Sequence, residues 1–387
     1  MRASNDRILT THVGALPAVP GIWSEAGANE ALMRQGVEDV VRRQRACGVD
    51  IVNEGELTKA GHWTQFVNER LAGFVPTTAR TTVTLMTDSE DWKEFDAFYK
   101  AAAEGGTLFE STRSTGDQTR NMDWACTSAV RYVGQKPLQR ELDCLGNALG
   151  GIAPGDAFLT STAPASLVPG RENRYYGTEE EYVYALAEAM RVEYEAIVQA
   201  GFLLQVDDAW LAGLWDRIGV KMGLEAYQRW CAVRVDALNH ALRNIPEDRV
   251  RYHLCWGSWH GPHAHDIPMA NIVHTMLRVK AQAYLFEAAN ARHEHEFAIW
   301  ERVKLPDSKI LVPGVVSHAT TLIEHPELVS MRILRFANIV GRERVMAGTD
   351  CGLGLRCHEQ IAWAKLKALA DGAALASQTL WRRKPAA

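Results

Sequence analysis

Short runs of β-branched and aliphatic residues alternate with longer amphipathic stretches along most of this chain. The first units are DRILTTHV (6–13), an amphipathic stretch over 30–47, and VDIVNEGE (49–56). The alternation resumes after residue 128, with further strand candidates at 129–134, 156–162, 202–208, 251–256, 283–288, 309–316 and 343–350. Such an alternation is typical of βα units that build a parallel sheet. We therefore expect an α/β fold, a (β/α)8 TIM barrel that forms one domain over 1–387.

The nine strand candidates exceed the eight of a barrel, so one is expected to be an extra edge or capping strand. The helix pattern is clear over 178–199, where Thr178 stands at a cap position and three acidic residues follow in the first turn. Residues 74–122 break the pattern, because they contain little apolar periodicity and a long polar run. A long insertion of this kind predicts a lid, a binding loop or an oligomer contact, and a homo-oligomer is left open.

Composition narrows the class of protein. The chain has 387 residues, 47% hydrophobic and 23% charged, which is ordinary for a folded domain. A net charge of -5 offers no basic stripe for nucleic acid. The N-terminal residues have no apolar signal core, and no uncharged run of 18 apolar residues follows, so we expect a cytoplasmic protein that does not span a membrane. Seven scattered cysteines do not form a disulfide framework.

Polar and metal-capable side chains gather where the predicted strands end. Barrel enzymes carry their chemistry at the carboxyl ends of the strands. The residues at these positions are His12, Glu54, Glu56, Ser161, Asp207, Asp208, His253, Cys255, Glu287, His318, Asp350 and Cys351. Loops are polar in any protein, so a single member of this set has little meaning, and the combination of His, Cys and Glu carries the argument.

The strand RYHLCW suggests a metal site. Strand alternation puts His253 and Cys255 on one face, where both could reach one ion, with Glu287 and Cys351 as remote candidates from other strands. Two thiolates, an imidazole and a carboxylate suit zinc, which tolerates sulfur and has no redox chemistry. The alternative is that the cysteines are small buried hydrophobic residues and that His253 is a core histidine with its hydrogen bonds satisfied.

Several motifs carry a family resemblance that favours the metal site. TTHVGALP, GVDIVNEGE, LLQVDDAW, HLCWGSWHGPH, LFEAANARHE and AGTDCGLGLR resemble the catalytic barrel of the cobalamin-independent methionine synthase family. The chain is especially similar to its short single-barrel members, among them epoxyalkane:coenzyme M transferases. The resemblance runs from Thr10 to about Ser377. The HxC and DCGLG motifs are specific when they occur together in this order.

The resemblance implies roles for individual residues. Zinc would be held by His253, Cys255, Glu287 and Cys351, and would activate a thiol that attacks an alkyl carbon. Asp207 matches an acid that often contacts a substrate amino group. The other expected contributors are His318 as a general acid that needs only a modest pKa adjustment, Glu56 as a substrate or proton-donor contact, and His12, Asp208, Trp256 and Ser161 as substrate contacts, with Gly14 allowing close backbone approach.

Two histidine clusters outside this set have simpler explanations. His260, His263 and His265 lie in a Gly-Pro loop directly after the HxC strand, and we expect loop packing or contacts around the site rather than a second metal. HEHE (293–296) alternates charge, which predicts a solvated or interface face.

The expected function is transfer of a methyl or alkyl group to a small-molecule thiol. Long synthases carry a second barrel that helps bind methylfolate, so a different donor is expected: a corrinoid-bound methyl group delivered by a corrinoid protein, a methylated small molecule, or an epoxide that the thiolate opens. Trp256 and Trp259 beside the zinc strand indicate an aromatic or apolar donor pocket. A zinc hydrolase or lyase is disfavoured because two sulfur ligands reduce Lewis acidity. A non-catalytic, zinc-stabilised barrel is the third alternative.

Overall fold

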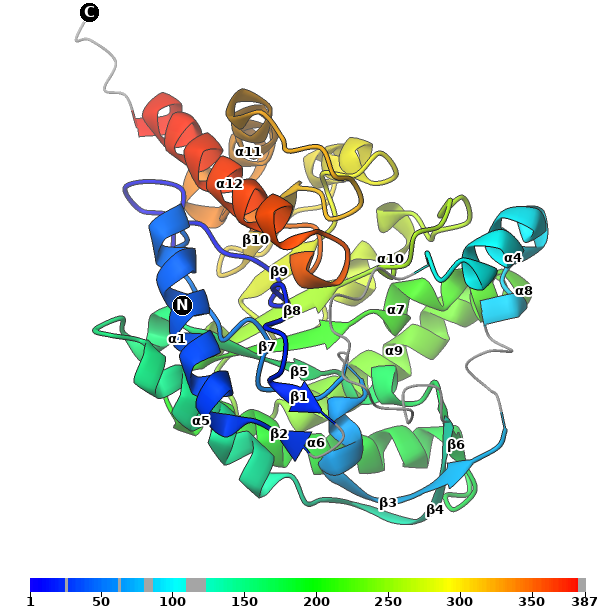
Figure 1. Ribbon diagram of the computed structural model, residues 1–387. Coiled ribbons are helices and arrows are strands. Elements are labelled where there is room, and N and C mark those ends of the chain that lie inside the picture. The colour runs from blue at the N-terminus through cyan, green and yellow to red at the C-terminus, as the bar shows by residue number, and fades with distance from the viewer. Residues whose placement is uncertain (25–26, 62–63, 80–85, 109–122, 382–387) are drawn as a thin grey trace, which may run out of the picture.

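A curled sheet of six parallel strands carries the predicted site residues at its carboxyl end. The computed structural model describes residues 1–24, 27–61, 64–79, 86–108 and 123–381, and Figure 1 shows how its elements are arranged. The strand order is β11-β10-β9-β8-β7-β5, and the strands pair in parallel. The bounds are β5 Phe158–Thr162, β7 Leu203–Asp208, β8 Val250–Leu254, β9 Ala283–Phe286, β10 Ile310–Val316 and β11 Gly348–Thr349.

Two segments near the N-terminus lie along the edges of this sheet. Thr10 forms a parallel bridge with Ala347, next to β11, and Val52 forms one with Ala157, next to β5. Between the two segments, the amide of Ile51 donates to the carbonyl of Thr10 at 3.1 Å. The α/β prediction is thus confirmed, with a curled parallel sheet of six strands, while the exact (β/α)8 barrel stays a prediction. The first two predicted strands are present as isolated bridges rather than as regular strands.

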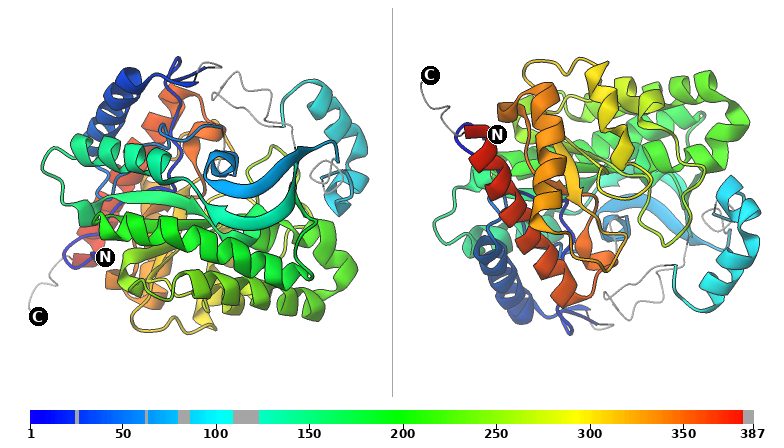
Figure 2. Two further views of the ribbon diagram at one scale, coloured as in Figure 1. Left: turned by 90° about the horizontal axis from the view of Figure 1, so that it is seen from below. Right: turned by 90° about the horizontal axis from the view of Figure 1, so that it is seen from above.

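Helices cover the outer face of the sheet (Figure 2). They bury a large apolar cluster between themselves and the strands. The long helices are α1 Glu30–Cys47, α5 Gln135–Ala148, α6 Glu179–Gln199, α9 Leu224–Ala241, α10 Met269–Met276, α11 Pro326–Val340 and α12 Glu359–Trp381. Among the described helices, none has the length and apolar character that a transmembrane span requires.

The start of α6 confirms the helix predicted over 178–199. The Thr178 side chain accepts a hydrogen bond from the amide of Glu181, and the Glu181 carboxylate accepts one from the amide of Thr178. This capping box satisfies two amides that have no partner within the helix. The acidic first turn also complements the helix dipole.

The inner face of the sheet changes from apolar to polar toward the carboxyl ends of the strands. A separate buried cluster contains Leu9, Val13, Ile51, Phe158, Leu203, Ala283, Leu285, Ile310, Val312 and Met346. Arg251 of β8 is buried here, and its guanidinium donates to Thr11 Oγ1 and to the carbonyl of His12, each at 2.8 Å. The strand register pairs Gln205 with Arg251 and Asp207 with His253, so polar residues lead directly up to the predicted metal site.

A second, three-stranded sheet explains the surplus strand candidate. Its order is β3-β4-β6, with β3 Leu71–Thr77 antiparallel to β4 Asp123–Tyr132 and β6 Arg171–Asn173 parallel to β4. The candidate over 129–134 therefore lies outside the six-stranded sheet.

The insertion predicted at 74–122 begins within β3 and ends directly before β4. It contains the short helices α3 Glu90–Glu94 and α4 Asp96–Glu104, while 80–85 and 109–122 lie outside the described residues. The remaining short strands and α-helices among the described residues are β1 Trp23–Ser24, β2 Gly27–Ala28, α7 Trp210–Gly213 and α8 Val220–Met222. The assignment of one domain over 1–387 stays a prediction.

A buried ionic network joins these layers. Lys59 contacts the carboxylates of Glu54 (3.2 Å) and Glu141, and Arg70 pairs with Glu141 (2.8 Å) and Glu193 (3.0 Å). All five side chains are at most 1% exposed. Because isolated buried charges are costly, each partner depends on the others.

Candidate metal centre

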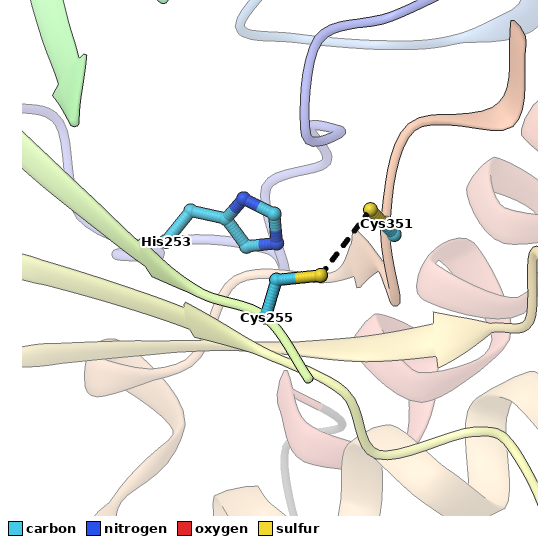
Figure 3. A group of neighbouring side chains, drawn as sticks. All are labelled: His253, Cys255 and Cys351. Atoms are coloured by element: carbon cyan, nitrogen blue, oxygen red, sulfur yellow. Dashed lines mark hydrogen bonds between the residues drawn. The ribbon is translucent and has the colours of Figure 1, made fainter. Parts of the chain in front are cut away.

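Three predicted ligands converge at the carboxyl end of the sheet. His253 lies on β8, Cys255 directly follows that strand, and Cys351 follows β11. Figure 3 shows the imidazole and the two sulfurs pointing toward one another. One ligand atom from each residue lies within 4.8 Å of the others, and all three residues are buried. The structure therefore brings together residues that are 96 positions apart in the sequence.

The spacing of these donor atoms fits a tetrahedral zinc site. The Sγ atoms of Cys255 and Cys351 are 3.8 Å apart, and Cys255 Sγ is 3.7 Å from Glu287 Oε1. With Zn–S bonds of about 2.3 Å, two sulfur ligands lie about 3.8 Å apart and a sulfur and an oxygen ligand about 3.6 Å apart. His253 Nε2 is buried without a hydrogen-bond partner. Buried polar atoms are normally paired, so this is the behaviour expected of a metal-ligand atom.

Glu287 lies between this group and a second one. It follows β9 and forms a set with His318 and Asp350, whose ligand atoms also lie within 4.8 Å of one another. Its Oε1 accepts the amide of Trp256 (3.2 Å), and its Oε2 accepts Asn290 Nδ2 (2.6 Å). Burial raises the pKa of Glu287 to about 7. Asn290 is a supporting residue that the sequence prediction missed.

The two cysteine sulfurs receive hydrogen bonds from the loop after β8. The Gly257 amide donates to Cys255 Sγ at 3.2 Å, and Ser258 Oγ lies 2.8 Å from Cys351 Sγ. The contact with Cys255 holds the pKa of the Cys351 thiol well below its usual range, and the same contact raises the pKa of Cys255. Ser258 was not predicted, although it lies only three residues after Cys255 in the HLCWGSWHGPH motif.

Asp207 supports the imidazole ligand. Its Oδ1 lies 2.9 Å from His253 Nδ1 and accepts a hydrogen bond from Gln205 Nε2 at 2.8 Å. Burial opposes the charged imidazolium, yet the Asp207 carboxylate and the nearby Cys351 sulfur raise the pKa of His253 to about 10. A carboxylate on one ring nitrogen leaves the other nitrogen to face the metal.

Asp208 has internal partners instead. Its carboxylate accepts Ser166 Oγ (2.6 Å), Tyr252 OH (3.0 Å) and the amide of Leu211 (3.3 Å). These contacts anchor the turn before α7. They match the capping explanation of an acid at this position more closely than a substrate contact.

His318 follows β10 and lies beside the site. Its Nε2 is 3.3 Å from Arg356 Nη1, while its Nδ1 is buried without a hydrogen-bond partner. Burial lowers the pKa of His318 to about 3, helped by the charge of Arg356. The expectation of only a modest pKa adjustment is therefore wrong, because the pocket favours the neutral ring.

Arg356 was missed by the prediction although it ends the AGTDCGLGLR motif. Its guanidinium also contacts His260 Nδ1 at 2.8 Å. His260 belongs to the histidine loop, and its neighbours His263 and His265 pair with Asp266 and Glu94. These are loop contacts, as the sequence predicted.

Glu56 and Gly14 approach each other closely beside Thr160 of β5. A Cβ at Gly14, whose φ is +141°, would lie 2.6 Å from Glu56 Oε1. This confirms that the absence of a side chain at Gly14 permits a close approach. Thr160 Oγ1 donates to the same Glu56 oxygen at 3.3 Å. Strand alternation turns Ser161 the other way, where its hydroxyl donates to Glu193 of α6 at 2.7 Å. Thr160 therefore lies beside Glu56, and the substrate contact of Ser161 stays a prediction.

The other two expected substrate contacts are buried. His12 Nε2 lies 2.7 Å from Gln44 Oε1 of α1, and the His12 ring packs edge-on against Phe158. The indole of Trp256 donates to the carbonyl of Ile267 (2.8 Å) and packs against the ring of His293. Their substrate contacts stay predictions.

The HEHE segment differs from its prediction. His293 is 4% exposed, and its ring lies 2.8 Å from Glu296 and 3.2 Å from Asp266. His293 precedes the short 3₁₀ helix Glu294–Glu301, in which Glu294 and Glu296 are half-buried and only His295 of the segment is exposed, so the predicted solvated face is confirmed at His295 alone.

Comparison with known proteins identifies the family. The family model of the cobalamin-independent synthase catalytic domain matches residues 170–375, which is more than half of the chain and includes all four predicted zinc ligands. The chain belongs to this family.

Curated relatives and a solved structure agree with this assignment. The chain is 23% identical over 252 residues to 2-hydroxypropyl-CoM lyase of Xanthobacter autotrophicus, a match that covers 58% of this chain and 63% of that protein. It is 24% identical over 228 residues to a methionine synthase of Saccharolobus solfataricus, with 58% and 60% covered. The matches therefore span about six tenths of these relatives.

The structure of a B12-independent methionine synthase from Shewanella sp. W3-18-1 superposes with a TM-score of 0.70. The sequence identity is 16%, and the match covers 97% of this chain and 99% of that chain. At this identity, the match establishes a shared fold.

Proposed function

We propose that this chain transfers a methyl or alkyl group to a small-molecule thiol at a zinc ion. The observation that carries the proposal is the convergence of two sulfurs 3.8 Å apart with an imidazole nitrogen that is buried and has no partner. His253, Cys255 and Cys351 would hold the metal, with Glu287 as fourth ligand. Zinc supplies the Lewis acidity that favours the thiolate form of a thiol substrate.

The chain's own residues prepare the site for that chemistry. Asp207 fixes the ring orientation of His253. Gly257 and Ser258 hydrogen-bond to the protein sulfurs, which lowers the nucleophilicity of those sulfurs relative to a substrate thiolate. In the transfer, the substrate sulfur forms a bond to the alkyl carbon, the bond between that carbon and the donor breaks, and the leaving group departs with the electron pair. The proton of the thiol ends on solvent or on the leaving group.

A second candidate is opening of an epoxide by the same activated thiol. It is favoured by the similarity to a relative named 2-hydroxypropyl-CoM lyase. Here the thiolate attacks an epoxide carbon, the ring C–O bond breaks, and the alkoxide takes up a proton. His318 is proposed to act on the leaving group in either reaction, as a hydrogen-bond donor because its pocket favours the neutral ring, while solvent supplies the proton. The alkyl donor is a methylated small molecule, a corrinoid-bound methyl group or an epoxide.

Zinc content per chain tests the proposal, measured on the unaltered protein and on the Cys255→Ser and Cys351→Ser variants. We expect about one zinc per chain, lost in both variants, and an additional sulfur neighbour in X-ray absorption after addition of coenzyme M or homocysteine. Normal zinc content in both variants would contradict the site. Incubation of the zinc-loaded protein and each thiol with either methylcobalamin or 1,2-epoxypropane then separates the two reactions by product.

A further inference from the structure

The helical insertion contacts the loop that follows β8. We call α3 and α4 the insertion helices and residues 257–266 the metal-site loop. Asp91 of α3 accepts the amide of His263 at 3.0 Å through Oδ2 and the amide of Ala264 at 2.8 Å through Oδ1. Tyr99 of α4 donates to Asp91 Oδ2 at 2.8 Å. One carboxylate therefore binds two consecutive amides of the metal-site loop and the second insertion helix.

The two side chains of the insertion helices that make these contacts are buried. Asp91 and Tyr99 are each 1% exposed. The Tyr99 hydroxyl also accepts the indole N–H of Trp259 at 3.0 Å, which adds a third point of attachment to the loop. A buried carboxylate without hydrogen-bond donors is unfavourable because it is removed from water and left unpaired. The hydrogen bonds between Asp91 and the loop are therefore favoured and hold the loop in place.

The path of the loop between these attachment points is tightly constrained. His263 has a φ of +53°, in the left-handed region that non-glycine residues seldom adopt. A Cβ at Gly261 would lie 2.4 Å from Trp259 Nε1 and 2.5 Å from Tyr99 OH. The loop therefore follows a strained course that its contacts with the insertion helices maintain.

The start of the same loop contacts both cysteine ligands. Gly257 donates to Cys255 Sγ and Ser258 lies within hydrogen-bond distance of Cys351 Sγ. Only a few residues separate these donors from Trp259 and His263, which the insertion helices hold. A displacement of the loop at Asp91 would thus move the donors away from the sulfurs.

We propose that Asp91 is a positioning residue that holds the metal-site loop so that Gly257 and Ser258 stay on the two cysteine sulfurs. The inference rests on the proposed function for its consequence, which is that these hydrogen bonds restrain the protein sulfurs while a substrate thiol reacts. The proposal gives the insertion helices a role in organising the candidate metal centre. Outer hydrogen bonds to metal ligands change the affinity and reactivity of a site in this way.

The first test measures cysteine alkylation by iodoacetamide in metal-free protein, resolved by peptide mass spectrometry. In Asp91→Ala we expect Cys255 and Cys351 to react about tenfold faster than in the unaltered protein. Cys231, a buried residue of α9, is an internal reference for global unfolding and should keep its rate. Asp96→Ala in α4, which removes an exposed pair with Lys100, is the matched control. Unchanged rates at Cys255 and Cys351, or a parallel rise at Cys231, would overturn the proposal.

The second test reads the sulfur hydrogen bonds directly through the Co²⁺-substituted protein. Loss of hydrogen bonds to a thiolate raises its electron-donor strength, so the sulfur-to-cobalt charge-transfer band should move to longer wavelength in Asp91→Ala and in Ser258→Ala. The double variant should shift no further than the larger single shift, because Asp91 acts through the loop. Additive shifts, or a spectrum identical to that of the unaltered protein, would refute the inference.

A milder variant keeps the tests decisive if Asp91→Ala does not fold. Tyr99→Phe removes one hydroxyl that joins Asp91 to Trp259, and we expect smaller changes in the same direction. Neither test uses a thiol substrate or an alkyl donor. A protein without transferase activity can therefore still confirm the positioning role, and the two proposals fail separately.

Discussion

Asp207 Oδ1 lies 2.9 Å from Nδ1 of His253, so the carboxylate sets the ring nitrogen that faces the two cysteine sulfurs. The family resemblance implied that Asp207 contacts a substrate amino group. In the structure, one oxygen of the Asp207 carboxylate contacts His253 and so supports a proposed metal ligand.

Asp207→Asn should therefore weaken zinc binding. An amide at this position is a poorer acceptor and can present its NH₂ group to the ring, so we expect the zinc dissociation constant to rise about 10- to 100-fold. Competition with a chromogenic chelator measures it. Asp208→Asn is the neighbouring control, because that carboxylate bonds Ser166 and Tyr252; it should lower stability and leave zinc affinity unchanged. Equal zinc affinity in Asp207→Asn and the unaltered protein would argue against the supporting role.

His318→Asn should keep zinc and lose turnover. His318 lies outside the group formed by His253 and the two cysteines, so the metal content should stay at the level of the unaltered protein. Because the neutral ring is proposed to donate a hydrogen bond to the leaving group, the single-turnover rate should fall about a hundredfold or more. Full turnover in this variant would show that His318 has no catalytic role and serves only as a hydrogen-bond partner of Arg356.

Arg70→Met should destabilise the fold strongly. The substitution leaves the buried carboxylates of Glu141 and Glu193 without their guanidinium partner, and we expect a loss of about 3–5 kcal/mol in the free energy of unfolding. Urea denaturation measures it. Arg278→Met, which removes an exposed pair with Asp236, should change the stability little. Similar effects of the two substitutions would contradict the importance of burial.

Acid should destabilise the protein in part through His12. Burial lowers the pKa of His12 to about 4, below the ordinary value of 6.5. Between these values the unfolded chain binds the proton and the folded chain does not, so stability falls as the pH drops from about 6.5 toward 4. The contribution is on the order of 3 kcal/mol. His12→Asn should flatten the pH dependence of the urea midpoint in this window. An unchanged slope would show that His12 titrates alike in both states.

The sequence allowed prediction of the parts of the site that strand periodicity determines. His253 and Cys255 share a face because strand side chains alternate, and Cys351 reaches them because parallel strands end at the same edge of the sheet. Ser161 was selected for its place at a strand end without use of alternation, and its hydroxyl lies on the side of the strand opposite to Thr160. An error of one position along a strand reverses the side on which the hydroxyl lies.

Other contributors depend on contacts between segments that no local pattern relates. Asp91 lies 172 residues before the amide of His263 that it binds, in a stretch whose polarity suggested only an irregular insertion. Arg356 was visible in its motif, but its neighbours His318 and His260 come from different strand ends. Periodicity describes each element separately, whereas these contacts arise only when the elements are assembled.

The separation of the two cysteines along the chain bears on how the protein is made. Cys255 follows β8, and Cys351 follows β11, almost at the end of the sheet. Synthesis must therefore proceed through Cys351 before both sulfurs exist, and β11 must then dock beside β10. Metal loading at the full ligand set thus requires a chain that has been synthesised through β11, and a protein shortened before residue 351 would retain most of the described strands and lack a complete metal centre.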